Sequence, residues 1–479
     1  MEEEELASLL ESLLDYGQEC EWIEFKKNND SEIGEYISAL SNSATLHDKD
    51  ESYLVFGVDD FTKEIVGTKV NFKDSDEIQI RSKLDPRTDF SANELYINGK
   101  RVLLFIIESA KQYPTKYCGE AFIRIKSSKT KLSKHADKEK ILWQKLSQQK
   151  FESTLAYKCK DESELFSLLD CSKFFKLLKI PSPDSKEDAI KKLIEYKVIA
   201  KKYNKIHITN LGAILFAIDL RKFDNLQRKA VRIIIYNGIN KVAPSRFDET
   251  WYEGYAIIFE SLIKFIELNL PINEVLSDTL RTDKKLYPMI AVREFMANAL
   301  IHQDFSITGT SPMVEIYDNR MEITNPGSPL IAVDRFIDHA PESRNEKLAF
   351  MMRQIGICEE RGSGVDRAID ACEIWQLPAP DIQNEDDYTR VTLFAPKPLN
   401  QMETKEKIRA VYQHCVLKYV AEDSMTNESI RKRFGIDDKN YPAASRIIKA
   451  AVEAGVIKPS NPELKANRYQ KYVPYWVQI

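Results

Sequence analysis

Three polar side chains of one predicted helix lie at a spacing that suits a metal ion bound to phosphate groups. Glu294, Asn298 and His302 follow one another at intervals of four residues, so they share one face of the helix. The amide oxygen of Asn298 can ligate a hard cation such as Mg2+, and the carboxylate of Glu294 can orient an attacking water molecule. Gly362 and Gly364 bracket a turn that runs into another predicted helix, where backbone N–H groups can hold phosphates. The two segments together predict a nucleotide site.

The motif E-x-x-x-N-A at Glu294, Asn298 and Ala299, together with the glycine turn, resembles the N-box and the glycine-rich lid of the GHKL ATPases. The resemblance covers roughly residues 228–396 and looks closest to the divergent GHKL-like domains of bacterial Schlafen-related proteins. It implies ATP and Mg2+ as cofactors. In an active ATPase of this type, Glu294 would be catalytic, Asn298 would bind the metal, and Gly362 and Gly364 would surround the phosphates.

GHKL proteins also carry an aspartate, in D-x-G-x-G, that contacts the adenine. The matching stretch here is IYDNRMEITNPGSP, which puts Asp318 at the adenine position. Arg320 and Glu322 stand where the family has glycines, which take positive φ and let a ligand approach the backbone. Three alternatives therefore remain: a pocket that binds nucleotide, a remodelled or inactive pocket, and a helix and turn with a purely structural role.

A second group of carboxylates lies near the N-terminus. Glu19 and Glu24 flank the start of a predicted strand, and Asp59 or Asp60 follows the predicted strand SYLVFGVDD. Three carboxylates that converge repel one another unless a divalent cation neutralises them, and such a cation can assist phosphodiester cleavage. The alternative is a solvated acidic turn and a salt-bridged strand face, in which Glu24 pairs with Lys26.

Most of residues 1–145 resembles the Schlafen-type AlbA-like domain, through Glu19, the E-F-K run at Glu24, the helix YISALSNSA, the strand end FGVDD and the strand FIRIKSS. The resemblance implies a compact α+β domain in which Glu19, Glu24 and Asp59 bind Mn2+ or Mg2+ and cleave structured RNA. Many AlbA-like domains only bind nucleic acid. The candidate phosphate contacts are Lys26, Arg124, Lys126, Lys129, Lys131 and Lys134.

Composition limits the classes of protein that remain. The 479 residues predict roughly three or four domains, and the net charge of −5 argues against a uniformly basic coat. Seven scattered cysteines without a CxxC pair indicate a reduced, cytoplasmic protein with no zinc site. The N-terminus is acidic, unlike a signal peptide, and no apolar run approaches 18 residues, so we expect no membrane span.

Residues 146–227 predict a helical connector of winged-helix type, with a helix, a β-wing around Asn204 and a second helix from about Thr209. Its exposed lysines could bind nucleic acid, or the connector could simply bridge domains. These lysines are Lys191, Lys192, Lys201, Lys202 and Lys205. A polar run at 399–407 predicts a linker after the GHKL-like unit at 228–398.

Residues 399–479 predict a winged helix-turn-helix. Thr426 can cap a helix that ends at Gly435, and AASRIIKAAVEAGVI is the candidate recognition helix. Residues 424–479 hold ten basic and five acidic side chains, so positive charge is concentrated here. The candidate nucleic-acid contacts are Arg431, Lys432, Arg446 and Lys449. Winged helices also dock proteins or dimerise, and that alternative stays open.

The sequence thus predicts a multidomain α+β protein: an AlbA/Schlafen-like α+β domain, a helical winged-helix-like connector, a GHKL-like α/β sandwich and a C-terminal winged helix-turn-helix. We expect a cytoplasmic bacterial homo-oligomer that binds DNA, RNA or both, as an ATP-responsive regulator or a component of anti-phage defence. One alternative is a Schlafen-like metal-dependent nuclease effector in anti-phage defence. The other is a non-catalytic oligomeric scaffold.

Overall fold

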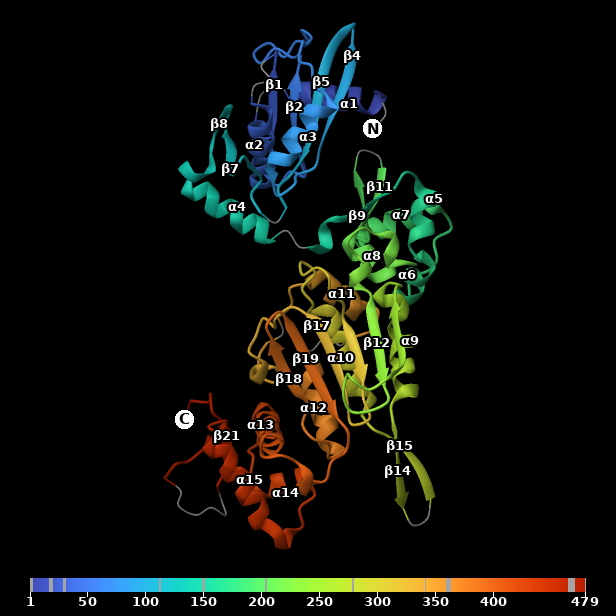
Figure 1. Ribbon diagram of the computed structural model, residues 1–479, viewed down its shortest axis with the longest axis vertical. Coiled ribbons are helices and arrows are strands. Elements are labelled where there is room, and N and C mark those ends of the chain that lie inside the picture. The colour runs from blue at the N-terminus through green and yellow to red at the C-terminus, as the bar shows by residue number, and fades with distance from the viewer. Residues whose placement is uncertain are drawn as a thin grey trace. The chain divides into compact units, whose positions relative to one another are not determined.

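The computed structural model describes residues 3–16, 20–28, 32–111, 113–148, 151–202, 205–277, 280–340, 342–358, 363–463 and 470–478. The chain divides into two compact units, Met1–Lys150 and Phe151–Ile479 (Figure 1). No helix among these residues is long and apolar enough to cross a lipid bilayer.

The N-terminal unit is built on a four-stranded sheet of order β1-β2-β5-β4. Its strands are β1 Ile23–Lys26, β2 Glu51–Phe56, β5 Lys100–Glu108 and β4 Phe90–Ile97. β1 and β2 are parallel, and the other pairs are antiparallel. A smaller sheet contains β3 Leu84–Asp85, β6 Lys116–Tyr117, β7 Glu120–Ile125 and β8 Ser128–Lys131. The unit is therefore α+β with mixed strand directions.

Four helices complete this unit: α1 Glu3–Asp15, α2 Ile33–Leu46, α3 Asp74–Lys83 and α4 Ala136–Gln148. The leucines of α1 pack with Phe25 and Val55, whereas Ile37 and Leu40 of α2 pack with Leu54 on the opposite side of the sheet. α2 is buried almost throughout, and its small polar side chains bond backbone groups outside the helix. The side-chain amide of Asn42, for example, donates to the carbonyls of Thr115 and Phe122 at 2.8 Å each.

The second unit begins with a connector of short elements. They are η2 Phe151–Ser153, β9 Leu155–Lys158, α5 Glu162–Leu168, α6 Cys171–Leu178, α7 Lys186–Glu195, β10 Ile199–Lys202, β11 Lys205–Thr209 and α8 Asn210–Phe216. β10 and β11 form an antiparallel hairpin, and β9 pairs with β11. A helix, a hairpin and a second helix follow one another here as the sequence predicts. The Thr209 hydroxyl accepts from the Gly212 amide and caps α8.

A six-stranded mixed sheet of order β13-β12-β16-β17-β19-β18 forms the centre of this unit. Its strands are β12 Val231–Tyr236, β13 Ser245–Trp251, β16 Met313–Ile316, β17 Arg320–Pro326, β18 Asp381–Glu385 and β19 Tyr388–Phe394. Only β12 and β16 are parallel neighbours. A separate hairpin joins β14 Ile272–Ser277 to β15 Leu280–Lys285.

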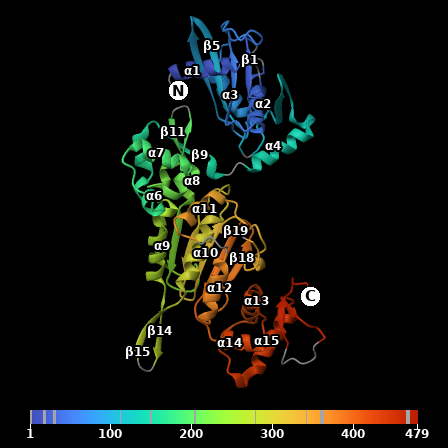
Figure 2. The ribbon, with the colours of Figure 1, turned by 180° about the vertical axis from the view of Figure 1, so that it is seen from behind.

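Helices of this central part pack on the sheet (Figure 2). They are α9 Tyr255–Asn269, α10 Met289–Ile301, α11 Glu346–Gln354 and α12 Gly364–Ile374. Buried side chains of α10 such as Phe295 join Val314 of β16 and Ile323 of β17 in one hydrophobic cluster, which also contains Ile369 of α12. This burial fixes which face of α10 is left for polar side chains.

The C-terminal part contains α13 Thr404–Val420, α14 Asn427–Phe434, α15 Tyr441–Glu453 and a hairpin of β20 Ile457–Pro459 with β21 Tyr472–Pro474. The same hydrophobic cluster runs from the connector through the central sheet into α13, α14 and α15. The run expected as a linker, 399–407, holds the 3-10 turn η6 Leu399–Gln401 and the first turn of α13, and Lys397 pairs with Glu406 at 2.8 Å.

Candidate functional site

The carboxylate of Glu294 lies where α10 meets the first turn of α12. Glu294 is 7% exposed, and the Arg367 guanidinium donates to its Oε1 at 2.6 Å. A Cβ placed on Gly364 would collide with the other carboxylate oxygen, Oε2. Gly364 is therefore required for the close approach of α12 to α10, and an anionic group already lies beside the positive end of the α12 dipole.

Asn298 and His302 continue the same line along α10. The Asn298 carboxamide is partly exposed and forms no hydrogen bond with a described residue. Burial, with a smaller contribution from the nearby Arg344 guanidinium, lowers the pKa of His302 to about 4. At neutral pH this face of α10 thus presents a carboxylate paired with arginine, an available amide and a neutral imidazole. A hard cation bound to phosphate could be ligated by the amide oxygen.

A tight turn after β17 lies against the C-terminal end of α10. Gly327 has φ +106°, and a Cβ there would collide with the Arg344 guanidinium and with Asp304. Arg344 pairs with Asp304 at 3.3 Å, and the Asp304 N–H donates to the Pro326 carbonyl at 2.8 Å. The side-chain amide of Asn345 donates to the carbonyls of Ile301 and Gln303, which holds the end of α10 in place.

Sequence reasoning missed this second group of residues. The available signal was the run Asn325–Pro326–Gly327 directly after a strand, since a glycine there can take the positive φ that the turn needs. Asp318, expected at an adenine position, is instead exposed in the turn between β16 and β17, where its N–H donates to the Gly238 carbonyl. That turn and Gly327 lie at opposite ends of β17, roughly 23 Å apart for a seven-residue strand. Gly362 lies outside the described residues.

Two of the N-terminal carboxylates, Glu24 and Asp59, each have their own cationic partner. Glu24, a residue of β1, contacts the Arg124 guanidinium and pairs with Lys26 at 3.1 Å. Asp59 pairs with Lys27 at 2.6 Å and accepts from two backbone N–H groups, so its pKa lies well below the ordinary value. Glu19 lies outside the described residues. Within the described part of the chain, no group of three or more His, Cys, Asp or Glu could hold a metal ion.

Arg124 is placed in the interior and corrects one expectation. It is 2% exposed, and besides contacting Glu24 it donates to the carbonyls of Cys20 and Ile23. Its role is therefore to join β7 to the segment around β1, because a buried guanidinium cannot reach a nucleic-acid phosphate. The distance along the chain between these partners explains why the sequence pattern did not reveal the pair.

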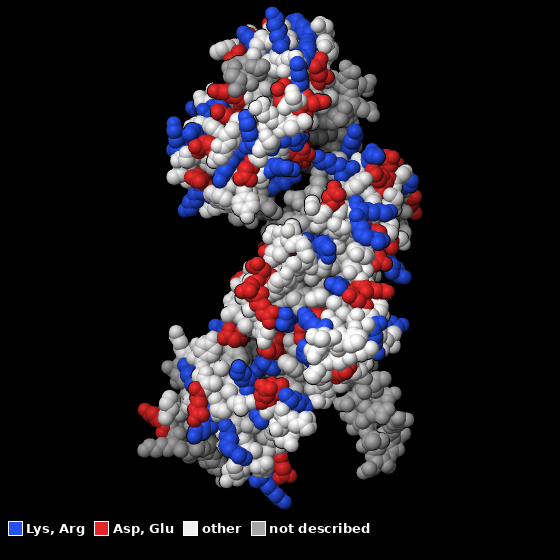
Figure 3. All heavy atoms as spheres, in the orientation of Figure 1, with Lys and Arg blue, Asp and Glu red and all other residues white. Residues whose placement is uncertain are grey.

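The other basic candidates of this unit are nearer the surface but mostly paired. Lys129 contacts Glu32 and Glu35, and both Lys129 and Lys26 lie over the ring of Tyr36. Two further candidates are Lys126, which is exposed, and Lys131, which pairs with Glu120. On the face drawn in Figure 3, basic and acidic side chains are interspersed over the N-terminal unit. On this face (Figure 3) the basic side chains lie in small groups among acidic ones.

The C-terminal module has the elements of a winged helix-turn-helix. The Thr426 hydroxyl accepts from the Ser429 amide at the start of α14, and Gly435 ends that helix in the left-handed conformation, both as the sequence predicts. Arg446 on α15 is exposed and has no ion pair with a described residue. Lys449, one turn along, is 76% exposed and pairs with Glu453 at 3.7 Å. Lys432 is similarly exposed and pairs with Glu428, and Arg431 contacts Asp438.

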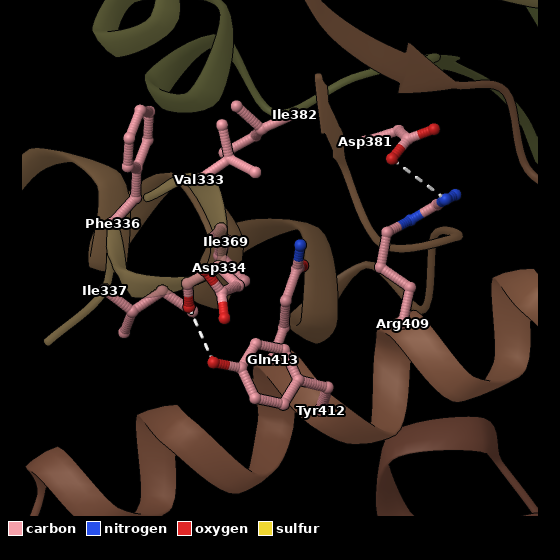
Figure 4. A pocket seen from close by; sticks show the side chains of 10 residues that line it. All are labelled: Val333, Asp334, Phe336, Ile337, Ile369, Asp381, Ile382, Arg409, Tyr412 and Gln413. Carbon is pink, nitrogen blue, oxygen red and sulfur yellow. Dashed lines mark hydrogen bonds and ion pairs between the residues drawn. The ribbon is translucent and has the colours of Figure 1, made fainter. Parts of the chain in front are cut away.

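A pocket of about 130 Å3 lies between the central sheet and α13 (Figure 4). Its walls come from η5 Val333–Arg335, from α12, from β18 and from α13. Across it the Tyr412 hydroxyl donates to the Asp334 carbonyl, and Arg409 pairs with Asp381. None of the expected site residues lines this pocket.

Comparison with known proteins identifies two segments. Residues 19–133 match the family described as Schlafen, AlbA_2, and residues 309–393 match the family described as Putative ATP-dependent DNA helicase recG C-terminal. The chain therefore carries a match to each of these two families in separate segments. The first match confirms the expected resemblance of the N-terminal unit. The second covers β16, β17, α11, α12, β18 and β19, and it begins after α10.

Two solved structures are similar to the chain at low identity. One is the DIP2311 protein from Corynebacterium diphtheriae, with 16% identity and a TM-score of 0.43 over 98% of this chain and 97% of that chain. The other is the N-terminal domain of a putative ATP-dependent DNA helicase RecG-related protein from Nitrosomonas europaea, with 24% identity and a TM-score of 0.19 over 26% of this chain and 90% of that domain. No curated protein sequence matches the chain.

Proposed function

We propose that this protein is an ATP-responsive, DNA-associated regulator that binds ATP with Mg2+ between α10 and α12. The observation that carries the proposal is the position of Glu294, whose carboxylate lies at the N-terminal end of α12 while Asn298 presents an available amide one turn along α10. The match of residues 309–393 to a domain family of ATP-dependent DNA helicases supports the same reading.

The residues present fit a magnesium–triphosphate group. The Asn298 oxygen would ligate Mg2+, which neutralises phosphate charge, and backbone N–H groups at the start of α12 would hold phosphate oxygens. Glu294 would then accept a hydrogen bond from a water molecule near the terminal phosphate, with Arg367 balancing its charge. Arg344, already close to His302 and Asp304, supplies a further positive charge at the same end of α10.

The proposed DNA contact is the exposed face of α15. Tyr441, Ser445, Arg446 and Lys449 are all exposed, and they recur at helical spacing. A helix of this kind, following the α14 turn and preceding the β20–β21 hairpin, suits the major groove. The N-terminal AlbA_2-type segment, with Lys126 exposed, would add contacts to the nucleic-acid backbone.

Metal-dependent cleavage is less favoured by the geometry. The carboxylates of Glu24 and Asp59 are both neutralised by basic side chains of the chain itself, so neither leaves a net negative charge to attract a divalent ion.

Thermal unfolding of the full chain with and without millimolar ATP and Mg2+ tests the nucleotide proposal. We expect ATP to raise the Tm, because a ligand that binds only the folded state stabilises it by mass action. Asn298→Ala should remove most of the rise by deleting the metal ligand. Asn384→Ala, at an exposed position of β18, is the matched control and should keep it. An unmutated protein whose Tm is unchanged by ATP would overturn the proposal.

A further inference from the structure

Helix α12 makes polar contacts at both ends, with two different parts of the second unit. Its first turn meets Glu294 of α10 through Gly364 and Arg367. Its last turn carries Glu373, whose carboxylate lies 2.9 Å from Nδ1 of His414 on α13 and 3.3 Å from Nε of Arg433 on α14. The helix has 11 residues, or roughly 16 Å at 1.5 Å per residue. A displacement of its first turn must therefore move Glu373 as well.

The contacts around Glu373 are buried and reach both ends of α14. His414 and Arg433 are 6% and 4% exposed. Nε2 of His414 lies 2.9 Å from the hydroxyl of Ser429, which belongs to the capping box at the start of α14. Arg433, in the last turn of α14, also donates to the Leu377 carbonyl. Because α14 packs directly on α15, the position of Glu373 bears on the helix proposed to contact DNA.

Separate contacts hold α13 against the central sheet. Arg409 pairs with Asp381 at 3.1 Å (Figure 4), and Gln413 donates to the Pro380 carbonyl at 2.8 Å. Both attachments include buried side-chain atoms that have no hydrogen-bond partner in the described structure. They are Nε and Nη1 of Arg433 and Oε1 of Glu373 in one, and Nη2 of Arg409 and Oε1 of Gln413 in the other. Buried polar atoms without partners gain free energy when they find one, so the Glu373–Arg433 contact can respond to a shift of α12.

We propose that α12 couples nucleotide binding at α10 to DNA binding by the C-terminal winged helix, through Glu373. The inference rests on the proposed function. ATP phosphates at the N-terminal end of α12 would need space that Glu294 and Gly364 now close between them. Their entry would shift the first turn of α12 relative to α10, while Arg367 keeps its pair with Glu294. The change is carried to α14 and α15 by Glu373, His414 and Arg433.

The test is the dissociation constant of ATP·Mg2+ for the full chain, measured with and without saturating duplex DNA. Thermodynamic linkage requires that a coupling in one direction appear equally in the other. We expect DNA to change the dissociation constant by about fivefold or more in the unmutated protein, which is within the usual range of such couplings. Glu373→Gln combined with Arg433→Met removes both buried charges together, so neither is left unpaired. This double variant should still bind each ligand on its own. The ratio of its ATP·Mg2+ dissociation constants with and without DNA should be near one.

Two further variants make the result decisive. Glu428→Gln on α14 breaks the exposed pair with Lys432 at 2.8 Å and should retain the full ratio. His414→Gln weakens the same network and leaves the Glu373–Arg433 charge pair in place. It should lower the ratio, and it provides the test should the double variant fail to fold. The coupling alone is overturned if the unmutated protein binds both ligands with a ratio of one. It is also overturned if the ratio stays unchanged in the folded double variant or in His414→Gln. Failure to bind ATP overturns the proposed function and the coupling with it.

Discussion

Several charged side chains at the candidate sites have partners within the chain, and the partner decides what each can do. Glu24 and Arg124 form a buried pair in which Arg124 also bonds two carbonyls. Such a pair ties distant segments together, and losing one member leaves the other charged in a region of low dielectric. Glu294 also pairs with an arginine, Arg367, whose side chain is partly exposed. This pair lies beside the available amide of Asn298, at the proposed nucleotide site.

Glu24→Gln should destabilise the protein instead of removing an activity. The change removes the Glu24 charge from the buried Arg124 guanidinium, which costs about 3 kcal/mol in the free energy of unfolding. Glu120→Gln, which breaks the surface pair with Lys131, should cost less than about 1 kcal/mol. Urea unfolding of the full chain measures both. Equal, small losses in the two variants would show that Glu24 has no structural role and would reopen the metal site.

His302 should make stability depend on pH. Because the folded-state pKa, about 4, lies below the ordinary value near 6.5, the unfolded state binds more protons between these values. Stability is therefore complete above about pH 6.5 and falls as the pH drops toward 4. The loss should be about 2 kcal/mol, less than a fully buried ring would give. His302→Gln should flatten this part of the profile, and a variant profile parallel to that of the unmutated protein would contradict the assignment.

At the scale of elements, the proposed DNA contact is the outer face of α15. Its apolar side chains pack inward, and Arg446 and Lys449 remain on the outer face. Removing both side chains as Arg446→Ala and Lys449→Ala should weaken binding to duplex DNA. The slope of log K against log salt should fall in magnitude by about 1.8, which corresponds to two phosphate contacts. Lys405→Ala with Lys407→Ala on α13 makes the same charge change and should leave the slope unaltered. Fluorescence anisotropy over a salt series gives the comparison.

Local sequence patterns predicted helices and their ends well, but they did not predict contacts between residues far apart in the chain. The caps of α14 at Thr426 and Gly435 follow from neighbouring residues, so the sequence was sufficient to place them. The four-residue spacing of Glu294 and Asn298 likewise placed them on one helix face. The Arg124–Glu24 pair and the turn at Gly327 against Arg344 depend on segments far apart in the chain. Asp318 was assigned to the adenine position from its place in the motif. In the structure, the pairing of β16 with β17 places it in the turn between these strands.

At the scale of the whole molecule, the central part of the second unit contacts the connector that precedes it in sequence and the helices α13 and α14 that follow it. Phe151 stacks on Phe305 with ring centres 4.5 Å apart, and the Glu152 carboxylate accepts from the N–H groups of Lys347 and Leu348 at the start of α11. Toward the C-terminus, α12 holds α13 and α14 through Glu373. The proposed α10–α12 site thus belongs to a part of the chain that contacts both the connector and α13 and α14.

The most direct test of the account is amide hydrogen exchange of the full chain with and without ATP and Mg2+. Nucleotide bound at the proposed site should slow exchange in α10 Met289–Ile301 and in the first turns of α12 Gly364–Ile374, because binding suppresses the local opening that exposes these amides. Asn298→Ala should abolish the protection in both helices. Exchange that ATP leaves unchanged in α10 and α12, or protection confined to other elements, would contradict the central claim that these two helices form a nucleotide site.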